Sequence, residues 1–148
     1  MASVRGCNFP DELYYNLEHN VWLRREADGQ VTIGMTAYAC ALSGEIVSYL
    51  PKNTGKTIDR DKSVCTVESG KWVGPVKTPV TGEITAVNEA AVTHPGIVNQ
   101  SPYGEGWIAT LRPADFEADR DNLIAGAEVV PAFEAKMAAD GFGGCGEV

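Results

Sequence analysis

Between residues 20 and 111, hydrophobic and polar positions alternate over short stretches punctuated by glycine, proline, asparagine and aspartate. Residues 21–24 and 31–35 flank Asp28-Gly29, a dipeptide that is typical of tight hairpin turns. The pattern therefore predicts an antiparallel hairpin here. The same reasoning predicts further strands over residues 45–50, 63–68, 76–80, 83–87 and 106–111.

Helical patterns interrupt and follow these strands. Thr36 can cap a short helical turn over residues 37–41, because a threonine side chain accepts a hydrogen bond from a free N–H group at a helix start. Beyond the strands the spacing becomes helical around residues 115–124 and 132–139, and Gly141 suits a helix end.

Length and charge narrow the class of protein. The chain has 148 residues, the usual size of a single domain, and we expect one domain with a β core over about residues 20–111 and an acidic helical part over about residues 114–141. Its formal charge of −8 would repel a phosphate backbone, so no nucleic-acid partner is expected. Apolar runs are shorter than the roughly 20 residues that span a bilayer, and residues 1–9 lack the apolar stretch of a signal peptide, so we expect no membrane partner and a cytoplasmic location.

The four cysteines fall into two groups by their position in the sequence. None forms a Cys-x-x-Cys motif, and we expect no metal site. Cys40 and Cys65 lie in apolar surroundings and are expected to be small buried hydrophobic residues. Cys7 and Cys145 lie near the ends of the chain, Cys145 within a glycine-rich tail, and are candidate redox thiols or partner contacts. A cytoplasmic setting favours accessible thiols over a disulfide.

Two motif resemblances predict no nucleotide site. Residues 141–146 spell G-x-G-x-x-G, but no strand precedes them and only two residues follow. Gly55-Lys56-Thr57 resembles the end of a phosphate-binding loop, yet Leu50 stands where that motif needs glycine. Only two histidines are present, and no hydrolase constellation is visible, so we expect no catalytic residues.

One short pattern occurs twice. Residues 43–47 (SGEIV) are echoed 38 residues later by residues 81–85 (TGEIT), and each copy leads into a predicted strand. This echo predicts two similar half-sheets packed face to face. Residues 67–72 lie between the two copies and are predicted to form the tip of a hairpin.

Lys71 stands at that tip. The predicted strand over residues 63–68 leads into it, and Gly70 would allow a turn with positive φ. The amine would project from the exposed end of a stiff hairpin, beside Glu68 and Ser69. Such a lysine, one of six in the chain, suits recognition by a modifying enzyme.

Motifs spread over most of residues 14–137 resemble the H protein of the glycine cleavage system. They include His19, Trp22, Tyr38-Ala39, Gly44-Glu45-Ile46-Val47, Val67-Glu68-Ser69, Lys71, Pro79-Val80-Thr81-Gly82-Glu83, Val98-Asn99 and Ser101-Pro102-Tyr103-Gly104-Glu105-Gly106-Trp107. The resemblance implies a mainly β lipoyl-domain fold with short helices, a barrel-sandwich of two sheets with a quasi-two-fold repeat and C-terminal helices. It also implies a carrier, not an enzyme, with lipoate attached to Lys71 as an amide, and Glu68, Ser69, Gly70 and Trp72 as recognition context.

The chain departs from the usual H-protein pattern at Gly70 and Trp72, where a small or branched apolar residue and an alanine are typical. The methionines that flank the lysine of biotin carriers are also absent. Residues 6–10 and 142–146 are similar to the lipoate-binding proteins of the heterodisulfide-reductase-like sulfur oxidation system, a branch of the same family. That resemblance implies a heterodisulfide-reductase-like complex, sulfurtransferases, lipoate ligase or other lipoylation enzymes and dihydrolipoamide dehydrogenase as partners.

Three hypotheses follow, of which the first is the main interpretation and the others are its alternatives. The first is a lipoyl carrier of sulfur intermediates in cytoplasmic sulfur oxidation. The second is an H protein that carries the aminomethyl group in glycine cleavage. The third, from a different class, is a cysteine-based redox protein or regulator that uses Cys7 or Cys145 without lipoate.

Overall fold

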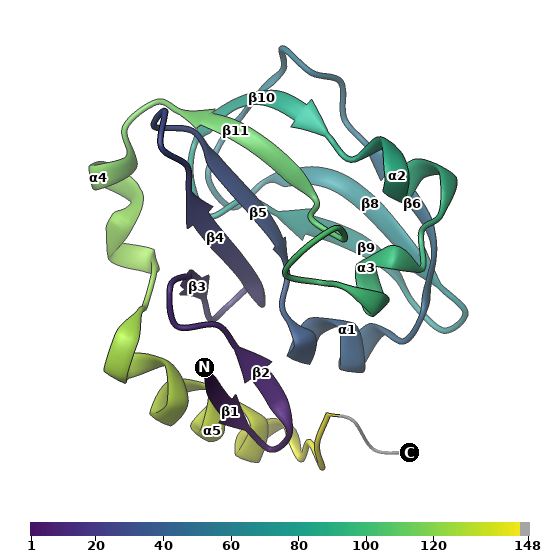
Figure 1. Ribbon diagram of the computed structural model, residues 1–148, viewed down its shortest axis with the longest axis vertical. Coiled ribbons are helices and arrows are strands. Elements are labelled where there is room, and N and C mark those ends of the chain that lie inside the picture. The colour runs from purple at the N-terminus through teal and green to yellow at the C-terminus, as the bar shows by residue number, and fades with distance from the viewer. Residues whose placement is uncertain (146–148) are drawn as a thin grey trace.

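The computed structural model describes residues 1–145; Gly146, at the end of the glycine-rich tail, lies outside them. The described chain forms two β-sheets that lie against each other with short helices around them (Figure 1). The larger sheet contains β3 (Tyr14–Asn16), β4 (Val21–Arg25), β5 (Val31–Met35), β7 (Thr57–Ile58), β10 (Gly82–Val87) and β11 (Ala109–Pro113). The smaller sheet contains β6 (Ile46–Pro51), β8 (Ser63–Ser69) and β9 (Val73–Lys77). A separate hairpin consists of β1 (Ala2–Val4) and β2 (Cys7–Phe9).

The pairing is antiparallel throughout the described chain, in the orders β3-β4-β5-β11-β10-β7 and β6-β8-β9. The hairpin predicted around Asp28-Gly29 is confirmed as β4 and β5, and Gly29 has a φ of +89°. The helices are α1 (Ala37–Ser43), α2 (Glu89–Thr93), α3 (Ile97–Gln100), α4 (Phe116–Asp119) and α5 (Val129–Asp140). No helix among residues 1–145 is long and apolar enough to cross a membrane.

The two sheets enclose one apolar core, to which both contribute fully buried side chains, among them Leu23, Ile33, Ile46, Val67, Ile84, Ile108 and Leu111. A hydrogen bond also ties the sheets together. The Tyr49 hydroxyl on β6 donates to the carbonyl oxygen of Ile108 at 2.5 Å and accepts the N–H of Asn88 at 3.1 Å. Because this buried polar group is satisfied across the core, it fixes the smaller sheet relative to the larger one.

The repeated segments begin strands in different sheets, β6 and β10, as the echo predicts. Their two glycines serve different purposes. Gly44 has a φ of +81°, which side-chain-bearing residues rarely adopt. Gly82 has no positive φ; instead, a Cβ atom there would lie 2.6 Å from the Arg112 carbonyl oxygen on β11. Gly82 therefore allows two backbones to approach closely.

Three element boundaries differ from the sequence predictions. The strand expected over residues 76–80 is β9, which ends at Lys77, because the Thr78 hydroxyl bonds the Val80 carbonyl and turns the chain before Pro79. The strand expected at residues 106–111 begins later, at Ala109. The helix expected over residues 115–124 breaks after α4 and a 3₁₀ turn, because Ile124 pairs with Tyr15 beside β3 and must be extended.

Helix predictions elsewhere are closer to the structure. Thr36 caps α1 by accepting the Ala39 N–H at 3.0 Å, and the helix continues to Ser43, where residues 37–41 were expected. The segment expected over residues 132–139 is the centre of α5, which ends at Gly141 with a left-handed φ of +68°.

A second buried cluster, which the sequence pattern does not reveal, joins the N-terminal hairpin to α5. The Phe9 and Phe133 rings lie 4.4 Å apart, and Tyr15, Trp22 and Tyr38 are buried with them. The residues before 20 therefore extend the packed structure beyond the expected β core.

The expectation of accessible thiols near the termini is wrong, because Cys7 and Cys145 form a disulfide. The tail is docked on the N-terminal hairpin, where the Cys145 N–H donates to the Arg5 carbonyl at 2.9 Å and the Arg5 guanidinium donates to the Phe142 carbonyl at 2.6 Å. Gly6 faces this tail so closely that a Cβ atom on it would lie 2.6 Å from the Cys145 carbonyl oxygen. These contacts between distant parts of the chain hold the two sulfur atoms together.

The close approach at Gly82 gives a stability prediction. We expect Gly82→Ala to lower the free energy of unfolding by about 1–3 kcal/mol, the usual cost of overpacking, because the new methyl group would meet the Arg112 carbonyl at 2.6 Å. Gly70→Ala is the matched control and should stay within about 0.5 kcal/mol, because no atom lies within 4 Å and its φ is not positive. Urea unfolding of both variants measures the difference, and equal stabilities would contradict the argument.

Candidate functional site

Lys71 lies in the three-residue loop between β8 and β9, and its side chain is exposed. The loop is closed by Ser69, whose N–H donates to the Trp72 carbonyl at 2.7 Å. The Ser69 hydroxyl accepts the Lys71 N–H at 3.3 Å and lies 3.4 Å from the Trp72 carbonyl. Ser69 is itself buried, so the loop is held from below while the lysine amine faces outward.

The turn does not use Gly70 as expected. Gly70 lacks a positive φ, and a Cβ atom there would meet nothing within 4 Å. The loop thus closes without a residue of positive φ, and within it the Ser69 hydroxyl accepts the Lys71 N–H. Gly70 therefore leaves open space beside the lysine instead of providing a special backbone conformation.

The stem of Lys71 lies over Gly44, where α1 ends and β6 is about to begin. Its Cε atom is 3.3 Å from the position that a Cβ atom on Gly44 would occupy. The side chain of Asn99 on α3 fixes this backbone, because its amide donates to the Gly44 carbonyl at 2.9 Å and its oxygen accepts the Ile46 N–H at 2.8 Å. Neither the Gly44 contact nor the Asn99 clamp is expected from the sequence; the repeat marks Gly44 only as the start of a strand.

Glu68 lies on β8 just before the loop, and Trp72 is the last residue of the loop. Glu68 is exposed and pairs with Val73 across the hairpin. The Trp72 indole is 38% exposed and rests against β9 at Gly74, where a Cβ atom would lie only 2.3 Å from Trp72 Cζ2. Gly74 thus determines where the indole lies, a role that the sequence pattern does not signal.

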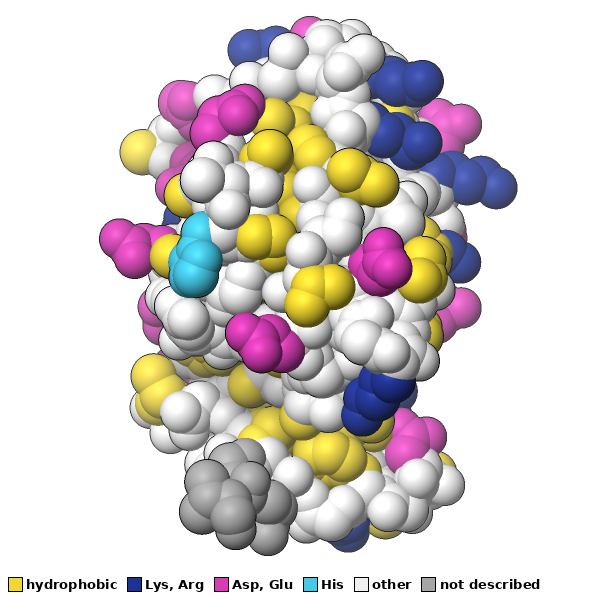
Figure 2. Space-filling model, turned by 90° about the vertical axis from the view of Figure 1, so that its right-hand side faces the viewer, with side chains coloured by type: hydrophobic (Ala, Val, Ile, Leu, Met, Phe, Trp, Pro, Cys, Tyr) yellow, Lys and Arg dark blue, Asp and Glu magenta, His cyan; other side chains and the backbone are white. Residues whose placement is uncertain are grey.

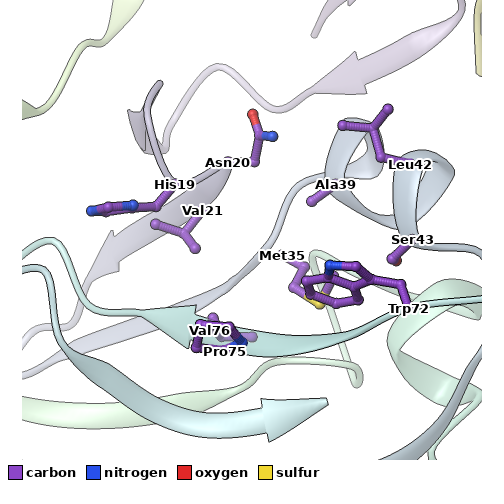
Figure 3. Close-up of a pocket in the computed structure, with 10 residues that line it drawn as sticks. All are labelled: His19, Asn20, Val21, Met35, Ala39, Leu42, Ser43, Trp72, Pro75 and Val76. Atoms are coloured by element: carbon purple, nitrogen blue, oxygen red, sulfur yellow. The ribbon is translucent and has the colours of Figure 1, made fainter. Parts of the chain in front are cut away.

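A cleft of about 240 Å³ opens beside the hairpin between α1, β9 and the segment before β4 (Figure 3). It is lined by His19, Asn20, Val21, Met35, Ala39, Leu42, Ser43, Trp72, Pro75 and Val76. Trp72 stands at the end near α1 and His19 at the opposite end. A shallower groove beneath the lysine, which Gly44 and Lys71 both line, shares Ser43 with the cleft. A group attached to Lys71 therefore has a largely apolar cavity beside it.

Two polar residues, His19 and Asn20, lie at the far end of the cleft. His19 Nε2 lies 2.8 Å from the carboxylate of Asp61, and the backbone N–H of His19 donates to Asn16 Oδ1 at 2.7 Å. Asn20 has a φ of +57°, and its buried Oδ1 atom has no hydrogen-bond partner among the described residues. Asn20 Oδ1 is thus a buried acceptor without a donor in the described chain, and in Figure 3 it points away from Val21 and Met35.

Apolar side chains are exposed on the smaller sheet and on α1, the elements next to the lysine. Val47 and Leu50 on β6 and Val73 on β9 are 59%, 63% and 62% exposed, and Leu42 on α1 is 43% exposed. Figure 2 views the side of the molecule where β6 and the β8–β9 hairpin lie, and hydrophobic side chains reach its surface between separate acidic and basic ones. Exposed apolar side chains of this kind are typical of surfaces that contact partners.

The two free cysteines are not part of this site. Cys40 and Cys65 are buried, and burial raises the pKa of each thiol to about 12. Both therefore stay protonated at neutral pH, which matches their interpretation as small hydrophobic residues.

Two facing sheets with short helices around them are the fold of the lipoyl-domain class. A family model described as "Glycine cleavage H-protein" matches residues 13–136, and the chain belongs to that family. Its members carry lipoate bound covalently to a lysine and act as carriers, not as catalytic enzymes. Their partners include lipoylation enzymes and the glycine cleavage enzymes, dihydrolipoamide dehydrogenase among them.

Individual relatives agree with this assignment. "Glycine cleavage system H protein 5" of Aquifex aeolicus is 50% identical over 127 residues, covering 84% of this chain and 86% of the relative. "Probable glycine cleavage system H protein 2" of Sulfurisphaera tokodaii is 38% identical over 132 residues and covers 88% of each chain. The crystal structure of a glycine cleavage system H protein from Mycobacterium marinum matches with a TM-score of 0.71 and 27% identity, covering 90% of this chain and 100% of that one.

The positions of the sulfur atoms predict an order of reactivity. In the folded protein without reductant, iodoacetamide at pH 8 should modify neither Cys40 nor Cys65, because burial holds the pKa of both thiols near 12. After mild reduction of the Cys7–Cys145 disulfide, the partly exposed Cys145 should be modified before the fully buried Cys7. Peptide mass mapping over time measures both, and rapid modification of Cys40 in the native protein would contradict the prediction.

Proposed function

We propose that Lys71 is the site of lipoyl attachment and that Glu68, Ser69, Gly70 and Trp72 form the surface that a lipoylation enzyme recognises. The observation that carries this proposal is the position of the lysine. Its amine is exposed at the hairpin tip, while its stem rests over Gly44. The other five lysines of the chain lie outside this loop.

The residues around Lys71 fit such a group. Gly44 leaves room for the lysine stem, since a Cβ atom there would lie 3.3 Å from Lys71 Cε. Acylation removes the positive charge of the amine, so the cost of placing the lysine end beside apolar surface falls. The adjacent cleft offers Met35, Leu42 and Trp72 as apolar walls. When bound, the lipoyl group supplies a dithiolane whose disulfide can be reduced to two thiols or opened by a nucleophile.

For the cargo, we propose the aminomethyl group of glycine cleavage. The names of the relatives support this choice over the sulfur hypothesis. The far end of the cleft supports it as well, because Asn20 lines it and its Oδ1 lacks a donor among the described residues; a turn of this side chain toward the cleft would let an amino group supply one. Asn20 and His19 would orient that group, and Val21 and Met35 would keep water away from it.

The second candidate cargo is a sulfur intermediate, delivered by sulfurtransferases to a heterodisulfide-reductase-like complex in the cytoplasm. One observation favours it. The Trp72 indole packs against Gly74 beside the lysine, where H proteins typically have an alanine. A partner that contacts the lysine would therefore meet a large aromatic side chain, a residue type enriched at binding hot spots. A cysteine-based redox protein without lipoate remains a third hypothesis, and it would not need an exposed lysine at the hairpin tip.

The attachment site is tested by substitution. We expect Lys71→Arg to abolish the mass increase that lipoate ligase and lipoate produce, because arginine cannot form the amide. Its melting temperature should stay close to that of the parent, since an exposed loop side chain contributes within about 0.5 kcal/mol. Lys56→Arg, which changes another exposed lysine, is the control and should accept lipoate normally. Lipoylation of Lys71→Arg would refute the assignment.

The cargo is tested by an enzymatic comparison. Lipoylated protein should support glycine-dependent release of carbon dioxide with purified glycine cleavage enzymes, and Asn20→Leu should weaken this more than it weakens reduction of the same protein by dihydrolipoamide dehydrogenase. The reason is that only the aminomethyl form needs the Asn20 acceptor. If glycine turnover is absent while deletion of the gene impairs growth of the source organism on reduced sulfur compounds, the sulfur hypothesis replaces the aminomethyl one.

A further inference from the structure

The Trp72 indole forms part of the cleft wall next to the lysine loop. Trp72 directly precedes β9, and side chains alternate along a strand, so its side chain shares a face with Gly74 and Val76. Gly74 leaves space on that face, and the indole fills it, because a Cβ atom at Gly74 would lie 2.3 Å from Trp72 Cζ2. The indole is therefore fixed against β9, while Trp72 remains 38% exposed and lines the cleft.

The stem of Lys71 comes close to the same wall at the end of α1. Its Cε atom lies 3.3 Å from the position of a Cβ atom on Gly44. Gly44 follows Ser43 in the chain, and the Cα atoms of bonded residues are about 3.8 Å apart. Ser43 lines both the groove under Lys71 and the cleft, and Figure 3 shows it beside the Trp72 indole. The groove therefore leads into the cleft at Ser43 and Trp72.

A lipoyl group on Lys71 is long enough for this short path. Eight bonds separate the lysine Cε atom from the first lipoyl sulfur, and an extended chain of that length covers about 9 Å. From its place over Gly44, the arm has to pass only Ser43, the neighbouring residue, to meet the indole. The near end of the cleft is thus within reach without any movement of the backbone.

The chemistry of this end of the cleft suits a dithiolane. Polarisable sulfur atoms make favourable contacts with aromatic rings. The ring carbons of the lipoyl group would leave water against Leu42 and Met35, which line the same cleft. A short tether keeps the effective concentration of the attached group in the millimolar range. A contact too weak to hold free lipoamide is therefore populated when the group is attached to Lys71.

We propose that Trp72 is the binding residue that seats the oxidised lipoyl ring at the end of the cleft near α1; this rests on the proposed lipoyl attachment at Lys71. The seated ring is shielded from reagents in solution, and a partner enzyme draws the arm out before it reacts. Trp72 thereby sets the fraction of carrier molecules that present a free arm.

The contact itself is tested by NMR on full-length protein that carries ¹³C-labelled lipoate, with occupancy of Lys71 checked by peptide mass. We expect nuclear Overhauser effects between the protons of the labelled ring and those of the Trp72 indole. Loss of these signals in the Trp72→Phe variant assigns them. Trp22, which is fully buried, should give none.

The consequence is tested by the rate at which a phosphine reductant opens the lipoyl ring, followed by quenching, alkylation and peptide mapping. Trp72→Ala should be reduced about two- to tenfold faster than the parent, because the contact between sulfur and the aromatic ring is lost. Gly74→Ala should also be faster, since the new methyl group would displace the indole without removing it. Val73→Ala is the matched control and should react like the parent, because Val73 is 62% exposed and does not line the cleft.

Absence of contacts between the lipoyl ring and Trp72, or equal reduction rates for the parent and Trp72→Ala, would overturn the inference and leave lipoyl attachment standing. An equal acceleration in Val73→Ala would also overturn it, because the effect would then come from the loop as a whole. Absence of lipoyl mass on Lys71 before reduction would refute the attachment, and the seat with it.

Discussion

The site depends on the way the chain leaves α1. Gly44 takes a φ of +81° there, and the Asn99 side chain holds the backbone on both sides of the turn through Gly44 and Ile46. This places a residue without a side chain beneath the stem of Lys71. A larger residue at Gly44 would face both backbone strain and contact with the lysine. The direction of the lysine is therefore set by a segment that precedes it by 27 positions in the chain.

Around this turn, α1 links three parts of the molecule. Its last residue, Ser43, lines both the groove under Lys71 and the larger cleft. Its buried Tyr38 belongs to the second apolar cluster, with Phe9 and Phe133. Its first carbonyl contacts the sulfur of Cys145. The hairpin, the cleft and the docked tail are consequently positioned against one short helix.

Features set by neighbouring residues could be predicted from the sequence. Asp28-Gly29 and the Thr36 cap are local signals, and both lead to the observed elements. The hairpin at Lys71 follows from two strand patterns on either side of a short polar stretch. The turn itself was less predictable. Gly70 was expected to have a positive φ but does not, and the Ser69 hydroxyl accepts the Lys71 N–H inside the loop.

Features that join distant residues could not be predicted in this way. The Cys7–Cys145 disulfide spans 138 positions, and its formation depends on the tail docking against Arg5 and Gly6. The break after α4 arises because Ile124 pairs with Tyr15. No local pattern signals either contact. The cleft similarly combines side chains from α1, β9 and the segment before β4, which only the folded chain brings together.

The central claim is that the folded hairpin presents Lys71, and no other lysine, for lipoylation. The most direct measurement is peptide mass mapping of the protein purified from its native source. We expect one lipoyl group, on the peptide that contains Lys71. A lipoyl group found consistently on Lys56 or Lys77 instead, or native protein that carries none, would contradict it.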